Sequence, residues 1–220
     1  MVGASKHKPS AIRSQNGIKY RTLCASCNNK VLGLKHDVAL KSFLDQVSDM
    51  LRTSTSLPYA FNVQGDIPSI TRAVLGHLCA VGVNRYDKGP ITERLRDFIL
   101  DETSAPLPTL KLYYWMYPFQ GVTLLRDFAL VDMPSDSVTV MWMMKLFPIA
   151  FAATWEQHPD VSFALPELTS LPQNMPGQKS EIPIFPYDSP ASDWPESPTP
   201  TSFAMMGQEA LRAYALRGSK

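Results

Sequence analysis

The sequence contains no hydrophobic run long enough to cross a bilayer. The longest apolar stretch, Met141–Ala153, is interrupted by Lys145 and Pro148, whereas a membrane-spanning helix needs about 20 apolar residues. The first residues are basic and polar and have no apolar core, which excludes a secretory signal there. We therefore expect a soluble, cytoplasmic protein with no membrane partner.

Cysteine is scarce, and its number excludes a scaffold stapled by disulfides. The chain has 3 cysteines, which cannot all pair with one another, and two of them form the C-x-x-C motif Cys24–Cys27. This usage is typical of a reducing compartment, where thiols bind metals or take part in redox chemistry.

Acidic side chains are absent from the first 36 residues, which carry seven Lys and Arg. The whole chain is nearly neutral, with a formal net charge of +1, so a globally basic nucleic-acid coat is excluded. A locally basic segment nevertheless favours contact with a polyanion, and we expect nucleic acid, above all DNA, as the partner.

Glycine is scarce beside proline, with 11 Gly against 19 Pro. Nine of the prolines lie within residues 161–200, together with five acidic residues and one lysine. This composition predicts a weakly acidic, proline-rich segment that wraps the surface or stays mobile. Four of its apolar side chains are candidate anchors for a protein partner: Ile184, Phe185, Tyr187 and Trp194.

Hydrophobic periodicity between these two segments predicts three amphipathic helices. Apolar residues recur at three- and four-residue spacing over 38–52, 69–82 and 91–101, which is the pattern of a helix with one buried face. Asp37 is the expected N-cap of the first helix. A similar pattern predicts a last helix over 203–216.

The pattern changes to alternation after the third helix. Apolar residues at every second position predict strands over 110–116, 122–130 and 138–144. Turn-like breaks between them indicate a three-stranded antiparallel meander. The third strand is apolar on both faces, so we expect it to be central or covered. The predicted fold class is therefore α+β.

Cys24 and Cys27 allow three interpretations. Two thiolates on a tight turn supply half of a tetrahedral zinc site, with the other half to come from elsewhere, for example from Cys79 or His77. A redox pair requires a C-x-x-C motif at the start of a helix. Because the long helix is expected to begin only near Val38, the sequence favours zinc over redox chemistry. Two thiols without a ligand are the third interpretation.

Residues 5–40 contain a further spaced pattern: His7, Pro9, Cys24, Cys27, Asn28, Gly33, His36 and Asp37. It resembles the HNH family of endonucleases, which have a ββα-metal (treble-clef) unit. The resemblance implies that His7 is the general base that activates water, that Asn28 orients this histidine, and that His36 or Asp37 binds a catalytic divalent metal such as magnesium or manganese. Hydrolysis of a phosphodiester needs both a base and a hard cation.

We therefore expect a metal-dependent nucleic-acid-binding protein with a structural zinc and HNH-type endonuclease activity on DNA. The expected parts are an HNH-like zinc-knuckle unit with the following helix (1–52), an α+β body (53–160), and the proline-rich segment with the last helix (161–220). The alternative is a catalytically inactive accessory protein of the kind found in phages or mobile elements. In that case the body and the proline-rich segment would bind a protein partner.

Overall fold

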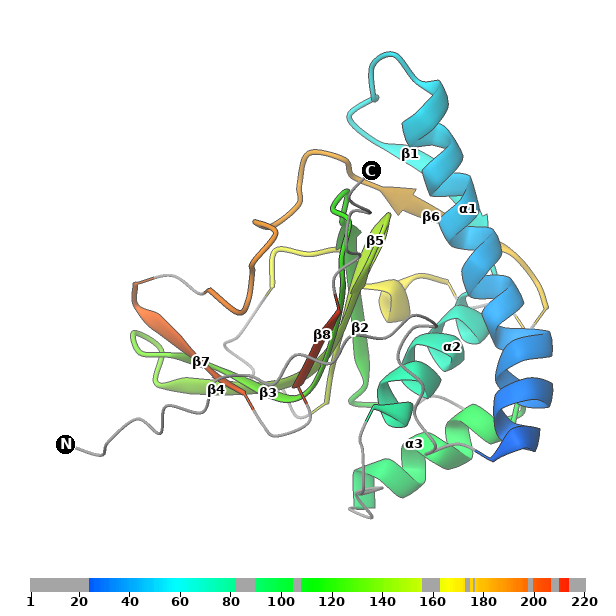
Figure 1. Ribbon diagram of the computed structural model, residues 1–220, viewed down its shortest axis with the longest axis horizontal. Helices are drawn as coiled ribbons and strands as arrows, with labels where there is room; N and C mark the ends of the chain where they lie inside the picture. Colours follow the sequence, from blue (N-terminus) through cyan, green and yellow to red (C-terminus); the bar gives the residue numbers. More distant parts are fainter. Residues whose placement is uncertain are drawn as a thin grey trace, which may run out of the picture.

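The computed structural model describes residues 24–81, 90–104, 108–155, 163–172, 175, 177–197, 200–206 and 210–213. Helices lie on one side of a curved antiparallel sheet, and part of the later chain, including β7, lies away from the helices (Figure 1). This arrangement confirms the α+β class. Within the described ranges, no helix combines the length and the apolar composition that crossing a membrane requires.

One continuous helical segment begins at Ala25 and ends at Thr53. It continues after Ser26 as the π-helix η1 (Cys27–His36) and then as α1 (Asp37–Thr53). Asp37 has helical angles, with φ −65° and ψ −30°, so its predicted role as an N-cap is wrong. The helix extends further towards the N-terminus than predicted because Leu32 of η1 is buried against α2.

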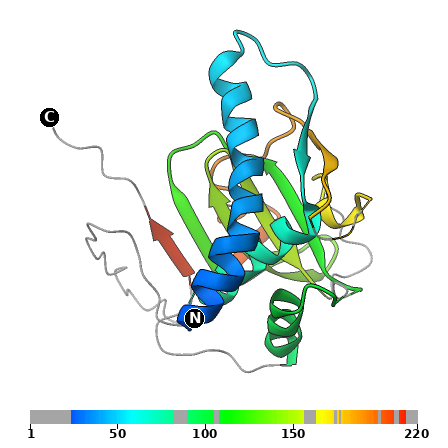
Figure 2. The same ribbon diagram turned by 90° about the vertical axis from the view of Figure 1, so that its right-hand side faces the viewer.

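The other two predicted helices are confirmed as α2 (Ile67–Ala80) and α3 (Pro90–Leu100). The Asp66 carboxylate caps α2 by accepting a hydrogen bond from the Ser69 N–H at 3.1 Å. α2 packs against η1, α1 and α3 and also contacts β3 and β4 of the main sheet. It is therefore the central element of the helical layer, and α1 runs along the outside of that layer (Figure 2).

The main sheet contains six described strands: β2 (Lys111–Met116), β3 (Val122–Asp132), β4 (Ser137–Leu146), β5 (Ile149–Thr154), β7 (Ser202–Met206) and β8 (Ala210–Ala213). Their order is β2-β5-β4-β3-β7, and β8 also pairs with β3. The three predicted strands are present as β2, β3 and β4, and β4 is central as expected. The predicted meander is wrong, because β5 lies between β2 and β4.

β5 is hidden in the sequence because Met141–Ala153 reads as one apolar run. The chain reverses at Phe147 and Pro148, so this run forms the β4–β5 hairpin, in which Met144 pairs with Phe151. β4 from Met141 to Lys145 and the whole of β5 are buried on both faces, which removes the alternation that would otherwise mark two separate strands.

The predicted helix over 203–216 is wrong wherever the structure describes it. β7 and β8 both pair antiparallel with β3, with Ala204 opposite Leu130 and Leu211 opposite Leu124. The apolar residues here are spaced as in a helix, yet backbone pairing with an available strand takes precedence, since strand formation depends strongly on tertiary context.

The proline-rich segment wraps the protein over most of its described length. Its strand β6 (Ser180–Ile184) pairs with β1 (Phe61–Gly65) in a separate two-stranded sheet. Further along, the Trp194 ring packs edge-on against Trp115, with 5.4 Å between centroids. Ile184, a predicted anchor for a partner, is 1% exposed, so it and Trp194 anchor the segment to its own chain.

Two buried clusters lie on opposite faces of the main sheet. Trp142 and Met144 belong to the cluster that includes the helices, whereas Met141 and Met143 belong to the cluster beneath Phe163 and Trp194. The sheet is thus covered by helices on one face and by the parts of the proline-rich segment around Phe163 and Trp194 on the other. The helix-side cluster includes residues from all three predicted parts of the chain.

Candidate functional site

Cys24 and Cys27 face each other across the first turn of the long helical segment. Their Sγ atoms are 2.8 Å apart, and the Cys27 N–H donates a hydrogen bond to the Cys24 Sγ at 3.1 Å. The Asn28 N–H donates to the Cys24 carbonyl at 2.9 Å, which closes this first turn. Cys24 is exposed, Cys27 is partly exposed, and no disulfide joins them.

The two thiols differ in acidity. The hydrogen bond with the Cys27 side chain lowers the pKa of Cys24, and the Cys27 N–H adds to this effect. The same side-chain hydrogen bond raises the pKa of Cys27, and partial burial adds to that increase. Cys24 is therefore the sulfur that ionises first, and thiolates are the form that binds metals and attacks disulfides.

The described residues supply only half of the predicted zinc site. Two sulfurs bound to one tetrahedral zinc at about 2.3 Å are roughly 3.8 Å apart, so the side chains of Cys24 and Cys27 would have to rotate away from each other. No group of three or more His, Cys, Asp or Glu in the described part of the chain could hold a metal. A complete zinc site would need further ligands from outside the described residues.

Cys79 and His77 do not complete the zinc site. Both lie on α2, and Cys79 is 2% exposed within the helix-side cluster. Burial raises the pKa of the Cys79 thiol to about 11, which opposes the ionisation that zinc binding requires. Cys79 is a small apolar side chain of the core.

The structure describes two of the three predicted catalytic residues, of which one is exposed and the other is buried. Asn28 is exposed, and its side-chain amide donates to Asn29 Oδ1 at 3.1 Å. His36 is 1% exposed, and burial, reinforced by the charge of Arg72, lowers the pKa of its imidazole. His36 is thus a neutral ring in the core. His7 lies outside the described residues.

Asp37 lies beside His36 but is oriented towards α2. Its Oδ1 is 3.0 Å from Nε2 of His77, and both side chains are partly exposed. Of the two predicted ligands for a catalytic metal, Asp37 lies near the surface, whereas His36 is buried. Local spacing in the sequence does not indicate its pairing with His77, since the two residues are 40 positions apart.

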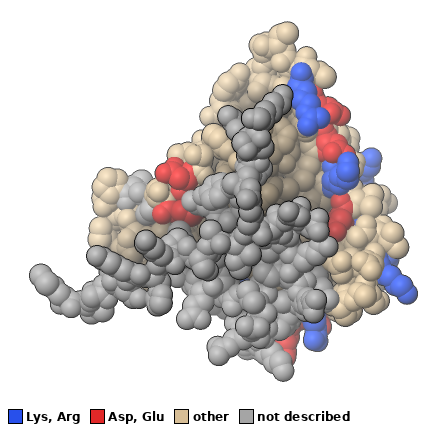
Figure 3. All heavy atoms as spheres, in the orientation of Figure 1, with Lys and Arg blue, Asp and Glu red and all other residues tan. Residues whose placement is uncertain are grey.

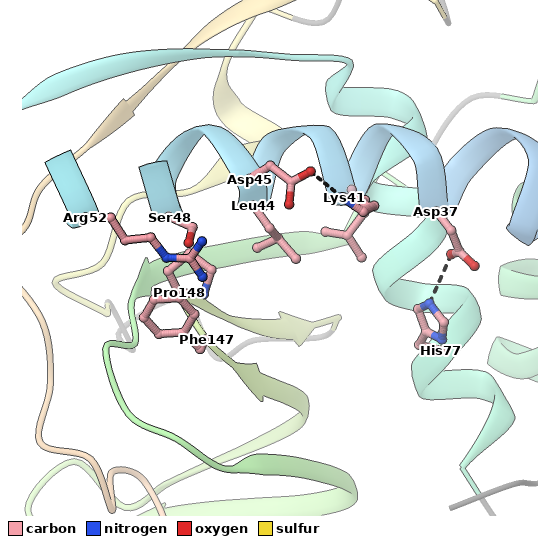
Figure 4. Close-up of a pocket in the computed structure, with 10 residues that line it drawn as sticks. Asp37, Lys41, Leu44, Asp45, Ser48, Arg52, His77, Phe147 and Pro148 are labelled. Carbon is pink, nitrogen blue, oxygen red and sulfur yellow. Dashed lines mark hydrogen bonds and ion pairs between the residues drawn. The ribbon is translucent and has the colours of Figure 1, made fainter. Parts of the chain in front are cut away.

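The Asp37–His77 pair lies in an open groove of about 410 Å³ between α1 and the β4–β5 turn. Leu40 and Leu44 provide apolar lining, and Arg52 and Phe147 lie at the far end from the pair (Figure 4). Lys41 and Asp45 form an ion pair along the rim. Such an open, shallow surface does not enclose a ligand as a small-molecule pocket does.

Basic side chains on the helical side of the molecule alternate with acidic ones (Figure 3). Lys35 pairs with Glu102 at 2.6 Å, and Lys41 pairs with Asp45. The positive charge of α1 and η1 is therefore partly neutralised. The basic residues before Cys24, on which the predicted contact with nucleic acid mainly depends, lie outside the described part of the chain.

Comparison with protein-family models, with curated proteins and with solved structures gives no match. The HNH resemblance over residues 5–40 stays a prediction from the residues themselves.

Proposed function

We propose that the protein binds nucleic acid, most readily DNA, through a metal-dependent unit at its N-terminal end. The observation that supports this most is an exposed pair of thiols, Cys24 and Cys27, within a segment whose first 36 residues carry seven basic and no acidic side chains. Zinc held by these thiolates would fix the end of the basic segment next to the folded body, because η1 is anchored on α2 through Leu32.

HNH-type hydrolysis of DNA is the second part of the proposal and depends on His7 as the base. Asn28 is accessible, as a residue that orients such a base must be. Because His36 is buried, Asp37 is the better ligand of the predicted pair for magnesium or manganese, which prefer carboxylate oxygens.

Salt dependence tests the contact with the phosphate backbone. Each lost phosphate contact reduces the slope of log K against log salt by about 0.9, so replacing Lys6, Lys8 and Arg13 by Ala should reduce it by up to about 2.7. Lys111→Ala, which changes an exposed lysine at the start of β2, is the control and should leave the slope unchanged. Equal slopes for the two variants would contradict the proposed contact.

Metal content tests the zinc site, and nicking of plasmid DNA tests the endonuclease activity. We expect about one zinc per chain, lost in Cys24→Ser, because a structural zinc needs both thiolates. With added magnesium or manganese, His7→Ala should abolish nicking while zinc content and DNA binding remain. Nicking that persists in His7→Ala would refute the assignment of the base.

Binding of a protein partner is the second candidate, and an exposed apolar strip on the main sheet favours it. Val138 and Val140 of β4 are 50% and 45% exposed, and Phe203 and Met205 of β7 are 46% and 49% exposed. The strand register places Val138 level with Phe203 and Val140 level with Met205, with β3 between them. Exposed apolar patches of this kind often mark protein contacts.

A further inference from the structure

We propose that Cys24 and Cys27 are a redox-active pair that closes to an intrachain disulfide by exchange with a low-molecular-weight disulfide such as oxidised glutathione. This inference goes beyond the proposed function, because thiol exchange needs neither nucleic acid nor metal. It rests on the placement of two nucleophilic side chains against each other at an exposed position.

The separation of the sulfurs suits a disulfide. At 2.8 Å, the Sγ atoms of Cys24 and Cys27 need to approach by only about 0.8 Å to reach the bonded distance of about 2.05 Å. Zinc binding would require the opposite movement, to about 3.8 Å. Both residues lie on one helical turn, so closure needs small side-chain rotations and no change in the packing of η1 on α2.

The position of the helix start favours redox chemistry, which the sequence disfavoured because the long helix was expected to begin only near Val38. The helical segment begins at Ala25, directly after Cys24, and not near Val38. The Cys27 N–H, one of the backbone donors left free at a helix start, points at the Cys24 sulfur. C-x-x-C motifs at helix N-termini are a setting in which cysteines become reactive.

The surroundings assign a different role to each sulfur. Cys24 is exposed and accepts the Cys27 N–H, so it attacks the external disulfide RSSR and releases one RS⁻. Cys27, which is less exposed, then attacks the Cys24 sulfur of the mixed disulfide and releases the second RS⁻. The protein loses two electrons and two thiol protons, and RSSR is reduced to two RSH.

The test uses the full chain with a chelator present. Protein is incubated with oxidised glutathione, quenched with iodoacetamide and digested with trypsin, which releases Cys24 and Cys27 together in the peptide Thr22–Lys30. We expect this peptide to lose two hydrogens and to resist alkylation. Cys79, which is 2% exposed, should be alkylated only after denaturation, and Cys79→Ala should behave like the wild type.

Trapping variants distinguish the two roles. Cys27→Ser should retain glutathione on Cys24, whereas Cys24→Ser should acquire little adduct. In the wild type, the Cys27 thiol competes with free glutathione for the mixed disulfide at an effective concentration in the millimolar range. With free reduced glutathione at about 0.1 mM, the wild type should therefore retain at least about tenfold less glutathione adduct than Cys27→Ser. A stable mixed disulfide in the wild type, or adducts formed equally on both cysteines, would overturn the proposal.

A parallel reaction with equimolar zinc separates this proposal from the proposed function. Protection by zinc would support both, since bound thiolates do not exchange. A disulfide that forms equally with and without zinc would support the redox pair and count against the zinc site. Failure to close in the chelated protein would overturn the redox pair and leave the zinc site standing.

Discussion

A buried ion pair holds the proline-rich segment on the main sheet. Lys145 of β4 is 1% exposed, and its Nζ lies 2.6 Å from Glu196 Oε2. The same ammonium group donates to the backbone carbonyls of Ser192 and Trp194, each at 3.1 Å. Trp194 covers the second buried cluster, so this pair secures the layer that shields that face from water.

We expect Glu196→Gln to lower the free energy of unfolding by about 3 kcal/mol. Removing one partner of a buried ion pair costs about 3–5 kcal/mol, because the other charge remains buried. The expected value lies at the lower end because Lys145 keeps two carbonyl acceptors, to which charge-assisted bonds contribute about 1.5–3 kcal/mol each. Replacing the pair together, as Lys145→Met with Glu196→Leu, removes both buried charges but also the donor to the carbonyls of Ser192 and Trp194, so we expect it to recover only part of the loss.

Urea denaturation followed by tryptophan fluorescence measures these free energies, and the contact of Trp115 with Trp194 reports on the segment directly. The dependence on urea should be the same for all variants if only the native state changes. A loss of less than about 1 kcal/mol in Glu196→Gln is the value of a surface ion pair and would refute the burial argued for Lys145.

Three further outcomes are expected, each checked by chemical denaturation. As the pH falls from 7 to 5, the free energy of unfolding should decrease, because burial lowers the pKa of His36 in the folded chain while the same histidine in the unfolded chain takes up a proton near pH 6.5. In His36→Leu the free energy of unfolding should decrease less over this range. A variant with the same pH profile as the wild type would contradict the role of His36. Leu32→Ala should lower the free energy of unfolding by about 2–5 kcal/mol through the cavity it leaves. Leu32 is 2% exposed and packs directly on Gly76, where an added Cβ would lie 2.5 Å from Leu32 Cδ2. A loss below about 1 kcal/mol would show that η1 is not anchored on α2. Asp66→Ala should cost about 0.5–2 kcal/mol by removing the cap on the Ser69 N–H. Asp66→Asn keeps one acceptor for the Ser69 N–H but loses the second oxygen, which accepts from the Gly177 N–H at 2.7 Å, and should recover part of this loss.

Local periodicity was sufficient to predict most of the helices and strands in the middle of the chain. α2, α3 and the strands β2, β3 and β4 lie close to their predicted ranges, since each shows several apolar residues at the spacing of its own secondary structure. The centrality of β4 could also be predicted, because a strand apolar on both faces must be covered on both faces.

The candidate site was harder to predict, because the residues that determine it have weak periodicity. Leu32 is one of only two buried residues of η1, so little in this stretch indicates a helix. The helix start, and with it the relation between Cys24 and Cys27, depends on the fit of Leu32 against Gly76 of α2. The pairing of Asp37 with His77 likewise requires α1 and α2 to pack together.

The sequence by itself determined the α+β class, the position of the C-x-x-C motif and the basic composition around it, since these follow from residue types and short-range spacing. Only the tertiary structure decided that β5 separates β2 from β4, that 202–206 and 210–213 are strands, and that the two thiols meet at a helix start. Each of these outcomes depends on a segment far away in the sequence, which supplies the strand or the apolar surface that the element packs against. Short-range spacing does not reveal which segment this is.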